Sequence, residues 1–116
     1  MSFEPGDVYL FNEGDDKQRP VLIVSREELN RGNYVVAVPF TTRNLDIRRS
    51  LPNCVAFNQG EFGLDKNCVA QAEAITLFRK EEFDLERGVV ARVDDEKMRD
   101  VIKAIGYVIS SDCEPQ

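Results

Sequence analysis

The residues of this chain that could do chemistry include no histidine at all. This excludes Ser-His-Asp and Cys-His machinery and ribonuclease mechanisms that use two histidines. Cys54, Cys68 and Cys113 form no closely spaced pair of zinc ligands, and neither a Walker loop nor a GxGxxG motif is present. We therefore expect no metal and no cofactor, and any chemistry must use Arg, Lys, Asp, Glu, Ser, Thr, Tyr or Cys side chains.

One arginine stands where a charge can serve a site without being buried. Arg19 and Pro20 directly precede Val21–Val24, an apolar run that predicts a buried strand with the proline as its first residue. Downstream, residues 34–42 predict a strand that ends in two threonines, and residues 43–50 predict a loop with three arginines and one aspartate. Taken alone, Arg-Pro before a strand indicates no more than the start of that strand.

The elements that must position these residues are short strands and one helix. The predicted strands are residues 6–11, 20–25, 34–42, 53–57, part of 67–76, and 87–93, with a polar loop at 12–17. Single helical turns are predicted at 25–30, with Ser25 as N-cap, and at 79–83. Pro39 predicts a bulge or a local edge. Short strands followed by a terminal helix favour a small antiparallel barrel.

The terminal helix has the clearest local signals. Asp94 is a good N-cap, and the acidic residues that follow suit the positive end of the helix dipole. Gly106 is expected to end or kink the helix. One apolar stripe is predicted along it, formed by Met98, Val101, Ile102 and Ile105.

The composition limits the kinds of ligand and partner that we expect the chain to bind. It has 116 residues, of which 42% are hydrophobic and 31% charged, with a net charge of −6. Such a protein lacks the basic coat that holds duplex nucleic acid or anionic lipid, although a local basic patch is compatible with it. No apolar run reaches membrane-span length, and the N-terminus has no signal-peptide pattern. We expect a cytoplasmic protein with reduced thiols and no membrane partner.

Six segments, in order along nearly the whole chain, carry a family resemblance. They are Gly6–Tyr9, Arg19–Ser25, Asn30–Arg31, Val36–Thr42, Gly63–Ala70 and Val93–Met98. They resemble, respectively, the opening Gly-Asp strand, the Arg-Pro before an aliphatic strand, the Asn-Arg pair, the strand ending in Pro-x-Thr-Ser, the Gly-Leu-x-x-x-Ser-Val segment and the start of the closing helix of the MazF/PemK family. Members of this family are the toxin ribonucleases of bacterial toxin–antitoxin pairs.

The resemblance implies an SH3-like antiparallel β-barrel with a C-terminal helix, as a single domain over residues 1–116 whose residues 110–116 are a frayed tail. It also implies a homodimer, with the apolar helix stripe and Tyr107–Ile109 packed either on the barrel or across a two-fold axis. A cognate antitoxin would fold across the site. The implied activity is growth inhibition by metal-independent cleavage of single-stranded mRNA, leaving a 2′,3′-cyclic phosphate.

The family's catalytic arginine and threonine correspond to Arg19 and Thr41. The chemistry needs no histidine, because the RNA supplies the nucleophile, its own 2′-hydroxyl. The guanidinium of Arg19 would clamp two phosphate oxygens and stabilise the phosphorane, and Thr41 would donate a hydrogen bond to the same phosphate. Glu73 is the candidate proton acceptor, because some relatives have an acidic residue at this step; an ordinary surface strand carboxylate is the equal alternative.

Further residues are candidates for binding the RNA. Each phosphate contact from the arginine loop would steepen the salt dependence of binding, and a solvated mobile loop is the equal alternative. Tyr34, Phe40 and Phe57 either stack on bases or, as their strand positions favour, pack in the core. The assigned RNA-binding residues are Lys17, Gln18, Thr42, Arg43, Arg48, Arg49 and Gln71.

Two stretches depart from the family and keep two other functions open. The acidic Glu13–Asp16, with Asp15 and Asp16 close to Arg19 in sequence, opposes phosphate binding. Residues 73–77 lack the glutamine and arginine of relatives, so the cleaved sequence cannot be transferred. One alternative is a non-catalytic binding module on the same barrel. The other is a DNA gyrase poison like CcdB, which the absence of tryptophan disfavours.

Overall fold

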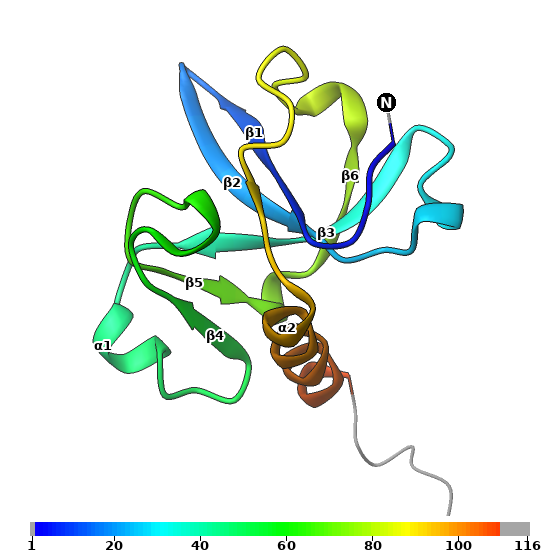
Figure 1. The fold of residues 1–116 in the computed structure, drawn as a ribbon. Helices are drawn as coiled ribbons and strands as arrows, with labels where there is room; N and C mark the ends of the chain where they lie inside the picture. The colour runs from blue at the N-terminus through cyan, green and yellow to red at the C-terminus, as the bar shows by residue number, and fades with distance from the viewer. Residues whose placement is uncertain (1, 110–116) are drawn as a thin grey trace, which may run out of the picture.

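Seven antiparallel strands form one curved sheet in the computed structural model, which describes residues 2–109 (Figure 1). The order is β4-β5-β3-β2-β1-β7, and β6 pairs with β3. This confirms the predicted barrel-like antiparallel architecture with a C-terminal helix. No helix within residues 2–109 is both long and apolar enough to cross a membrane. The strands are β1 (Asp7–Gly14), β2 (Lys17–Ile23), β3 (Tyr34–Thr41), β4 (Cys54–Phe57), β5 (Cys68–Gln71), β6 (Thr76–Arg79) and β7 (Ala91–Arg92).

Strand β3 is the centre of the sheet because it pairs with three other strands. Its first half, Tyr34–Ala37, pairs with β6, and its end, Phe40–Thr41, pairs with β5. Pro39 lies between these two ladders, where its missing N–H removes no hydrogen bond from either. The local edge predicted from Pro39 is therefore confirmed: Pro39 lies in the gap between the part of β3 that pairs with β6 and the part that pairs with β5.

Helix α2 (Asp95–Val108) closes the fold, and its predicted cap is confirmed: the Asp94 carboxylate accepts a hydrogen bond from the backbone N–H of Lys97 at 2.9 Å. The helix does not end at Gly106, as one form of the prediction had it, but runs on to Val108. The predicted stripe is also partly wrong. Ile102 is 51% exposed, and the buried face consists of Met98, Val101 and Ala104.

The remaining helical segments are short: α1 (Leu45–Arg48) and 3-10 turns at Glu27–Leu29, Glu61–Gly63, Ala72–Ala74 and Lys80–Glu82. The turn predicted at 79–83 is confirmed, whereas the loop predicted at 43–50 contains α1. Ser25 is not an N-cap. Its hydroxyl instead donates to Asn30 Oδ1 and accepts from the backbone N–H of Val36, because the Asn30 side chain is buried beside it.

Two apolar cores hold the sheet and the helix together. One packs α2 against the sheet and includes Phe40 and Phe57, which are 2% and 1% exposed and therefore cannot stack on bases. The other is an aromatic cluster in which the rings of Phe3 and Tyr9 stack with centroids 4.4 Å apart. Tyr34 is 45% exposed. Cys54 and Cys68 are buried on strands as predicted, while Cys113 and the predicted frayed tail lie outside the described residues.

Candidate active site

The hairpin of β1 and β2 is tighter than the sequence predicts. Only Asp15 and Asp16 form the turn, both with positive φ (49° and 61°), as in a type I′ turn. The predicted loop over residues 12–17 is therefore wrong, and so is Pro20 as the first strand residue. Pro20 lies inside β2, in a stretch that does not pair with β3, and such a free edge tolerates a missing N–H.

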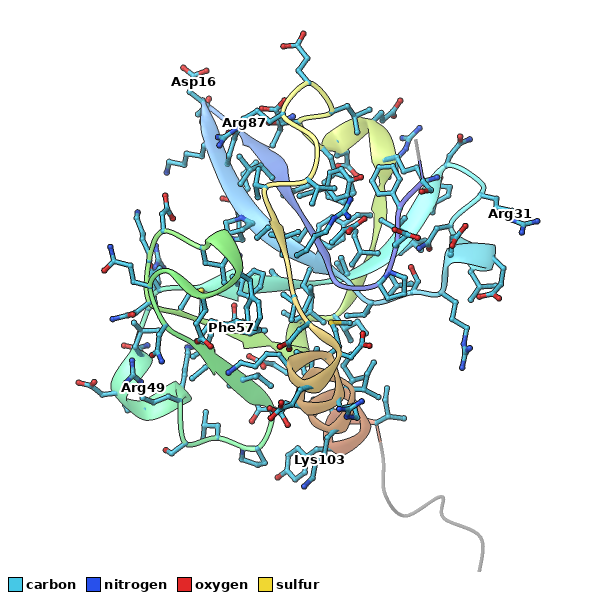
Figure 2. All side chains as sticks on the ribbon, in the orientation of Figure 1. Asp16, Arg31, Arg49, Phe57, Arg87 and Lys103 are labelled. Atoms are coloured by element: carbon cyan, nitrogen blue, oxygen red, sulfur yellow. The ribbon has the colours of Figure 1, made fainter. Side chains whose placement is uncertain are left out.

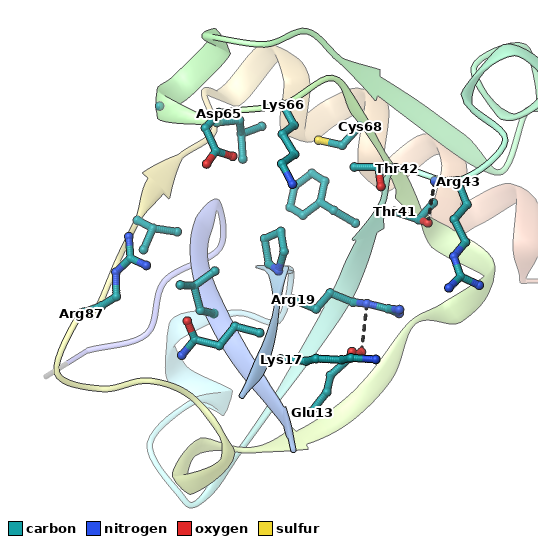
Figure 3. A pocket seen from close by; sticks show the side chains of 17 residues that line it. Glu13, Lys17, Arg19, Thr41, Thr42, Arg43, Asp65, Lys66, Cys68 and Arg87 are labelled. Atoms are coloured by element: carbon teal, nitrogen blue, oxygen red, sulfur yellow. Dashed lines mark hydrogen bonds and ion pairs between the residues drawn. The ribbon is translucent and has the colours of Figure 1, made fainter. Parts of the chain in front are cut away.

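The candidate site lies where β2 and β3 separate. Their pairing stops at Val21 opposite Pro39. Continuing this register would place Arg19 directly opposite Thr41, but the two strands diverge there and a pocket of about 650 Å³ opens between them (Figure 3). Typical ligand pockets measure roughly 300–1,000 Å³. The pairing of β2 with β1 thus holds Arg19, and the pairing of β3 with β5 holds Thr41, on facing sides of one cavity.

The pocket brings together six of the ten residues that the sequence assigned to catalysis and RNA. These six line it: Lys17, Gln18, Arg19, Thr41, Thr42 and Arg43. The other four, Arg48, Arg49, Gln71 and Glu73, do not line it. The division follows the sheet, because the first group flanks the point where β2 and β3 separate, while the second belongs to β5, α1 and the adjoining turns.

The Thr41 hydroxyl is oriented by the chain that follows it. Its Oγ1 accepts a hydrogen bond from the backbone N–H of Arg43 at 3.2 Å. A threonine hydroxyl has one hydrogen to donate, and an accepted bond does not use it. Thr41 therefore keeps its proton available for an anion in the pocket.

Arg19 forms an ion pair with a carboxylate of the neighbouring strand. Its Nε lies 3.0 Å from Glu13 Oε1, with the two side chains 43% and 32% exposed (Figure 3). The β1–β2 register shifts between Asn12 and Gly14, so Glu13 occupies a bulge, a feature that redirects a side chain. Because the pair uses Nε, the two terminal nitrogens of the guanidinium remain for a phosphate. The closeness of Asp15 and Asp16 to Arg19 in the sequence predicts that they oppose phosphate binding. Within residues 2–109, however, neither of them forms an ion pair with Arg19.

Cationic side chains dominate the pocket of this acidic protein. Two of them, Lys66 and Arg87, are additions from the structure, since no sequence pattern distinguished them from surface cations. Lys66 stands in the segment Gly63–Ala70, whose resemblance to the family implies no role for it, and Arg87 stands at the start of the strand predicted over residues 87–93. The pocket lining contains five cations, Lys17, Arg19, Arg43, Lys66 and Arg87, and two carboxylates, Glu13 and Asp65.

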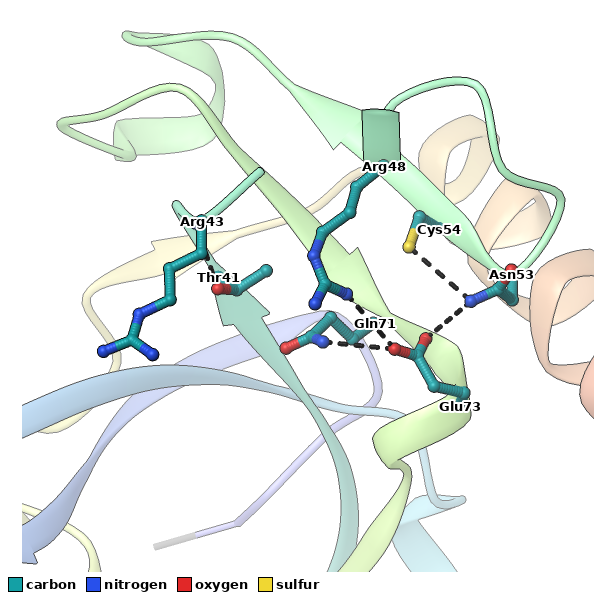
Figure 4. Close-up of polar contacts among 7 residues, drawn as sticks. All are labelled: Thr41, Arg43, Arg48, Asn53, Cys54, Gln71 and Glu73. Carbon is teal, nitrogen blue, oxygen red and sulfur yellow. Dashed lines mark hydrogen bonds and ion pairs between the residues drawn. The ribbon is translucent and has the colours of Figure 1, made fainter. Parts of the chain in front are cut away.

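Glu73 belongs to a separate polar cluster next to β5 (Figure 4). It lies in the turn Ala72–Ala74 and not in the strand that the sequence predicted. Its carboxylate accepts hydrogen bonds from Asn53 Nδ2 at 2.8 Å and Gln71 Nε2 at 3.1 Å, and Arg48 Nη1 lies 3.4 Å away. Burial by itself raises the pKa of Glu73, but the donors from Asn53 and Gln71 and the charge of Arg48 outweigh it, so the pKa lies below its ordinary value.

A curved antiparallel sheet with a closing helix, and a cation-lined pocket between two of its strands, define this chain as a small β protein with a pocket that is mainly cationic. The chain belongs to the family of PemK-like, MazF-like toxins of type II toxin–antitoxin systems, whose model matches residues 4–109. The resemblance identified in the sequence is thereby confirmed.

Solved structures agree with this assignment. An endoribonuclease in complex with its cognate antitoxin, from a mycobacterial species, is 27% identical with a TM-score of 0.75, over 93% of this chain and 95% of that chain. Two further structures are less than 25% identical and support the fold alone. The Mycobacterium tuberculosis toxin MazF-mt6 is 21% identical with a TM-score of 0.72, over 89% of this chain and 95% of that chain. A MazE-MazF structure from Deinococcus radiodurans is 18% identical with a TM-score of 0.72, over 95% and 97%. Comparison with curated protein sequences gave no match.

Proposed function

We propose that this chain is the endoribonuclease toxin of a toxin–antitoxin pair and that it cleaves single-stranded mRNA without a metal, leaving a 2′,3′-cyclic phosphate. The observation that carries the proposal is the placement of Arg19 and Thr41 on facing sides of a cationic pocket. Family membership and the likeness to a mycobacterial endoribonuclease support the same activity.

In the proposed reaction, the 2′-hydroxyl passes its proton to an acceptor and attacks the adjacent phosphorus, and the bond from phosphorus to the 5′-oxygen of the next nucleotide breaks as that oxygen takes a proton from water. The terminal nitrogens of Arg19 hold two phosphate oxygens and stabilise the additional charge of the phosphorane. Thr41 donates its hydroxyl hydrogen to the same phosphate. These two side chains therefore stabilise the transition state, while the RNA brings its own nucleophile.

Two carboxylates compete for the role of proton acceptor. Glu73 remains the prediction from the resemblance, but three donors surround it and its lowered pKa makes it a weaker base. Glu13 lines the same pocket as Arg19 and Thr41 and lies next to the guanidinium. The pocket thus favours Glu13, and replacing each glutamate by glutamine distinguishes them.

The direct test is incubation of the purified protein with mixed-sequence RNA in EDTA. We expect cleavage, with products that carry a 2′,3′-cyclic phosphate by mass spectrometry, and loss of cleavage in Arg19→Ala and Thr41→Ala. Intact RNA at micromolar protein would refute the proposal. The Glu13–Arg19 ion pair would then favour a non-catalytic binding module, and stabilisation of gyrase cleavage complexes would test the gyrase alternative.

The remaining parts of the proposal concern the partners and the compartment. We propose a cytoplasmic homodimer that stops growth when its antitoxin is missing and is neutralised by that antitoxin. The exposed Ile102 and Tyr107 on α2 (51% and 62%) support an apolar contact across a two-fold axis. A light-scattering mass near the 13.2 kDa of one chain would refute the dimer.

A further inference from the structure

Two further cations, Lys66 and Arg87, line the pocket besides Lys17, Arg19 and Arg43. Figure 3 shows Arg87 on one side of the cavity and Arg43 on the other, with Arg19 between them and Lys66 above. Lys66 and Arg87 come from different segments, the loop that leads into β5 and the loop between β6 and β7. The pocket therefore extends past the reacting centre that Arg19 and Thr41 would form.

Arg87 is held at this place by a carboxylate that links three segments. Asp84 accepts hydrogen bonds from Gln18 Nε2 at 3.0 Å and from the backbone N–H of Arg87 at 3.1 Å. Its own backbone N–H donates to the carbonyl of Leu10 at 2.8 Å. These contacts fix the loop against β1 and β2. The hydrogen bonds, first of all that from Gln18, hold the pKa of Asp84 below its ordinary value.

Lys66 is placed by the close approach of two backbones. Gly63 has a φ of 92°, and a Cβ at this position would lie 3.4 Å from the carbonyl oxygen of Val90. Since 3.4 Å is an ordinary contact distance, the positive φ is what favours glycine in this loop, which packs against the strand leading to β7. Lys66 follows three residues later, and its side chain lines the cavity.

The charges of these two cations are available to a ligand. Within residues 2–109, neither Lys66 nor Arg87 forms an ion pair within 4 Å, and both are exposed. Asp65 also lines the pocket and reduces the local positive charge, but it does not cancel two cations. Cations that are held in a cavity without partners favour an anionic ligand.

The pocket lining also contains apolar side chains. Four of them are Leu10, Pro20, Leu64 and Val90. The face of a nucleobase or a ribose suits such a surface, whereas a phosphate does not. The pocket therefore combines the guanidinium of Arg19, an apolar floor made of these four side chains, and two further cations.

We infer that Lys66 and Arg87 bind a second phosphate region of a single-stranded RNA, neighbouring the phosphate at Arg19, while the nucleotide between them rests on the apolar floor. This inference rests on the proposed ribonuclease function and extends it. It makes Lys66 and Arg87 substrate-binding residues that neither contact the reacting atoms nor contribute to the chemical step.

The test measures how RNA binding depends on salt. The probe is a fluorescein-labelled, short, mixed-sequence RNA with 2′-O-methyl groups throughout, which has no free 2′-hydroxyl and cannot be cut by this reaction. Dissociation constants are measured by anisotropy between about 50 and 200 mM KCl. The variant is Lys66→Ala with Arg87→Ala. The matched control is Lys103→Ala with Arg99→Ala, which removes the same charges from exposed positions on α2; Figure 2 shows Lys103 far from Arg87.

For a single strand, each phosphate contact contributes about 0.7 to the slope of log affinity against log salt. We expect the slope of the pocket variant to fall by about 0.7 to 1.4 and its affinity at low salt to fall roughly tenfold. The control variant should keep the wild-type slope. A pocket variant that folds, as shown by an unchanged melting temperature, and keeps the wild-type slope would overturn the inference.

The outcomes separate this inference from the proposed function. If the wild-type protein cleaves RNA and the slope is unchanged in the pocket variant, the second phosphate position is wrong and the ribonuclease stands. If the wild-type protein binds but does not cleave, and the pocket variant loses slope, the ribonuclease is wrong and the second position stands. If the wild-type protein does not bind the probe, the inference is overturned whatever the cleavage assay shows.

Discussion

The pocket between β2 and β3 and the polar cluster around Glu73 are both built from arginines and carboxylates, but they satisfy their charges differently. In the cluster, a single carboxylate receives two amide donors and one arginine. In the pocket, Glu13 pairs with Arg19 (Figure 3), and within the described part of the chain none of the other four lining cations has an ion-pair partner.

This difference separates a cluster whose charges are satisfied within the fold from a pocket that we propose binds a ligand. A carboxylate whose oxygens are already hydrogen-bonded stabilises its surroundings and accepts little more. The cluster lies beside β5, which pairs with the end of β3, so it supports the strand that carries Thr41. Cations that have no ion-pair partner in a cavity remain available to interact with an anionic ligand. Both regions contain residues that the sequence assigns to catalysis or RNA binding, and the following variants distinguish the two regions.

The largest effect is expected at Arg19, with Arg48 as the matched arginine of the polar cluster. Arg19→Ala should lower kcat/KM for RNA by roughly 10²–10³-fold, the usual loss when a preorganised donor to a charged transition state is removed. Arg48→Ala should cost less than about tenfold, because Arg48 contacts Glu73 and not the pocket. Initial rates on one RNA substrate measure both. Equal losses would mean that the two regions act as one site. Arg19→Lys should recover little, because an ammonium lacks the two-pronged geometry.

The next effect separates two adjacent threonines. Thr41→Val preserves the shape of the side chain but removes the hydroxyl that faces the proposed phosphate, and we expect about a tenfold to hundredfold lower cleavage rate, as for a hydrogen bond to a charged group. Thr42→Val removes an exposed hydroxyl from the same pocket and should stay within about threefold. Single-turnover kinetics compare the two. A loss in Thr42→Val as large as that in Thr41→Val contradicts the role given to Thr41.

A smaller effect concerns the carboxylates near Arg19. Glu13→Gln removes an exposed ion-pair partner, which is worth about 0.2–1 kcal/mol, so affinity for uncleavable RNA should rise by up to about fivefold. The control replaces Asp15 and Asp16 with asparagine, which also tolerates the positive φ of the turn. Salt screens the charges of these two aspartates, so the affinity for uncleavable RNA should change by less than about twofold. If Glu13→Gln binds more tightly but no longer cleaves, Glu13 is the proton acceptor. A larger gain from the aspartates would contradict the assignment of Glu13.

The smallest effect is on stability and its pH dependence. Because the pKa of Glu73 is lower in the folded chain than its ordinary value, the charged carboxylate stabilises the fold above the unfolded pKa of about 4.3, and this contribution is lost as pH falls through the folded pKa. The side chain is 39% exposed, so solvent screening keeps the contribution below about 1 kcal/mol.

Urea unfolding of wild type and Glu73→Gln at several pH values measures this contribution. We expect the variant to be less stable at neutral pH and to approach the wild type at acidic pH, with most of its cleavage activity retained. Loss of cleavage at unchanged stability would instead support Glu73 as the proton acceptor.

Local patterns predicted the features that depend on near neighbours. The alternation and spacing of apolar runs indicated short antiparallel strands, and Asp94 directly before an amphipathic stretch indicated the capped helix. Both patterns depend only on residues that are close together in the sequence. The same patterns misjudged the hairpin at Asp15–Asp16 and the length of β2, since two residues with positive φ can complete a turn that looks like a longer polar loop.

The sequence by itself, through its composition and its ordered family motifs, determined the fold, the absence of histidine chemistry and the choice of Arg19 and Thr41. Only the tertiary structure decided that these two face one another, that Glu13 contacts the arginine, and that Lys66 and Arg87 complete the pocket while Glu73 does not line it. The physical reason is strand register. Where β2 and β3 stop pairing depends on every strand that holds them, and that information is not local to any one motif.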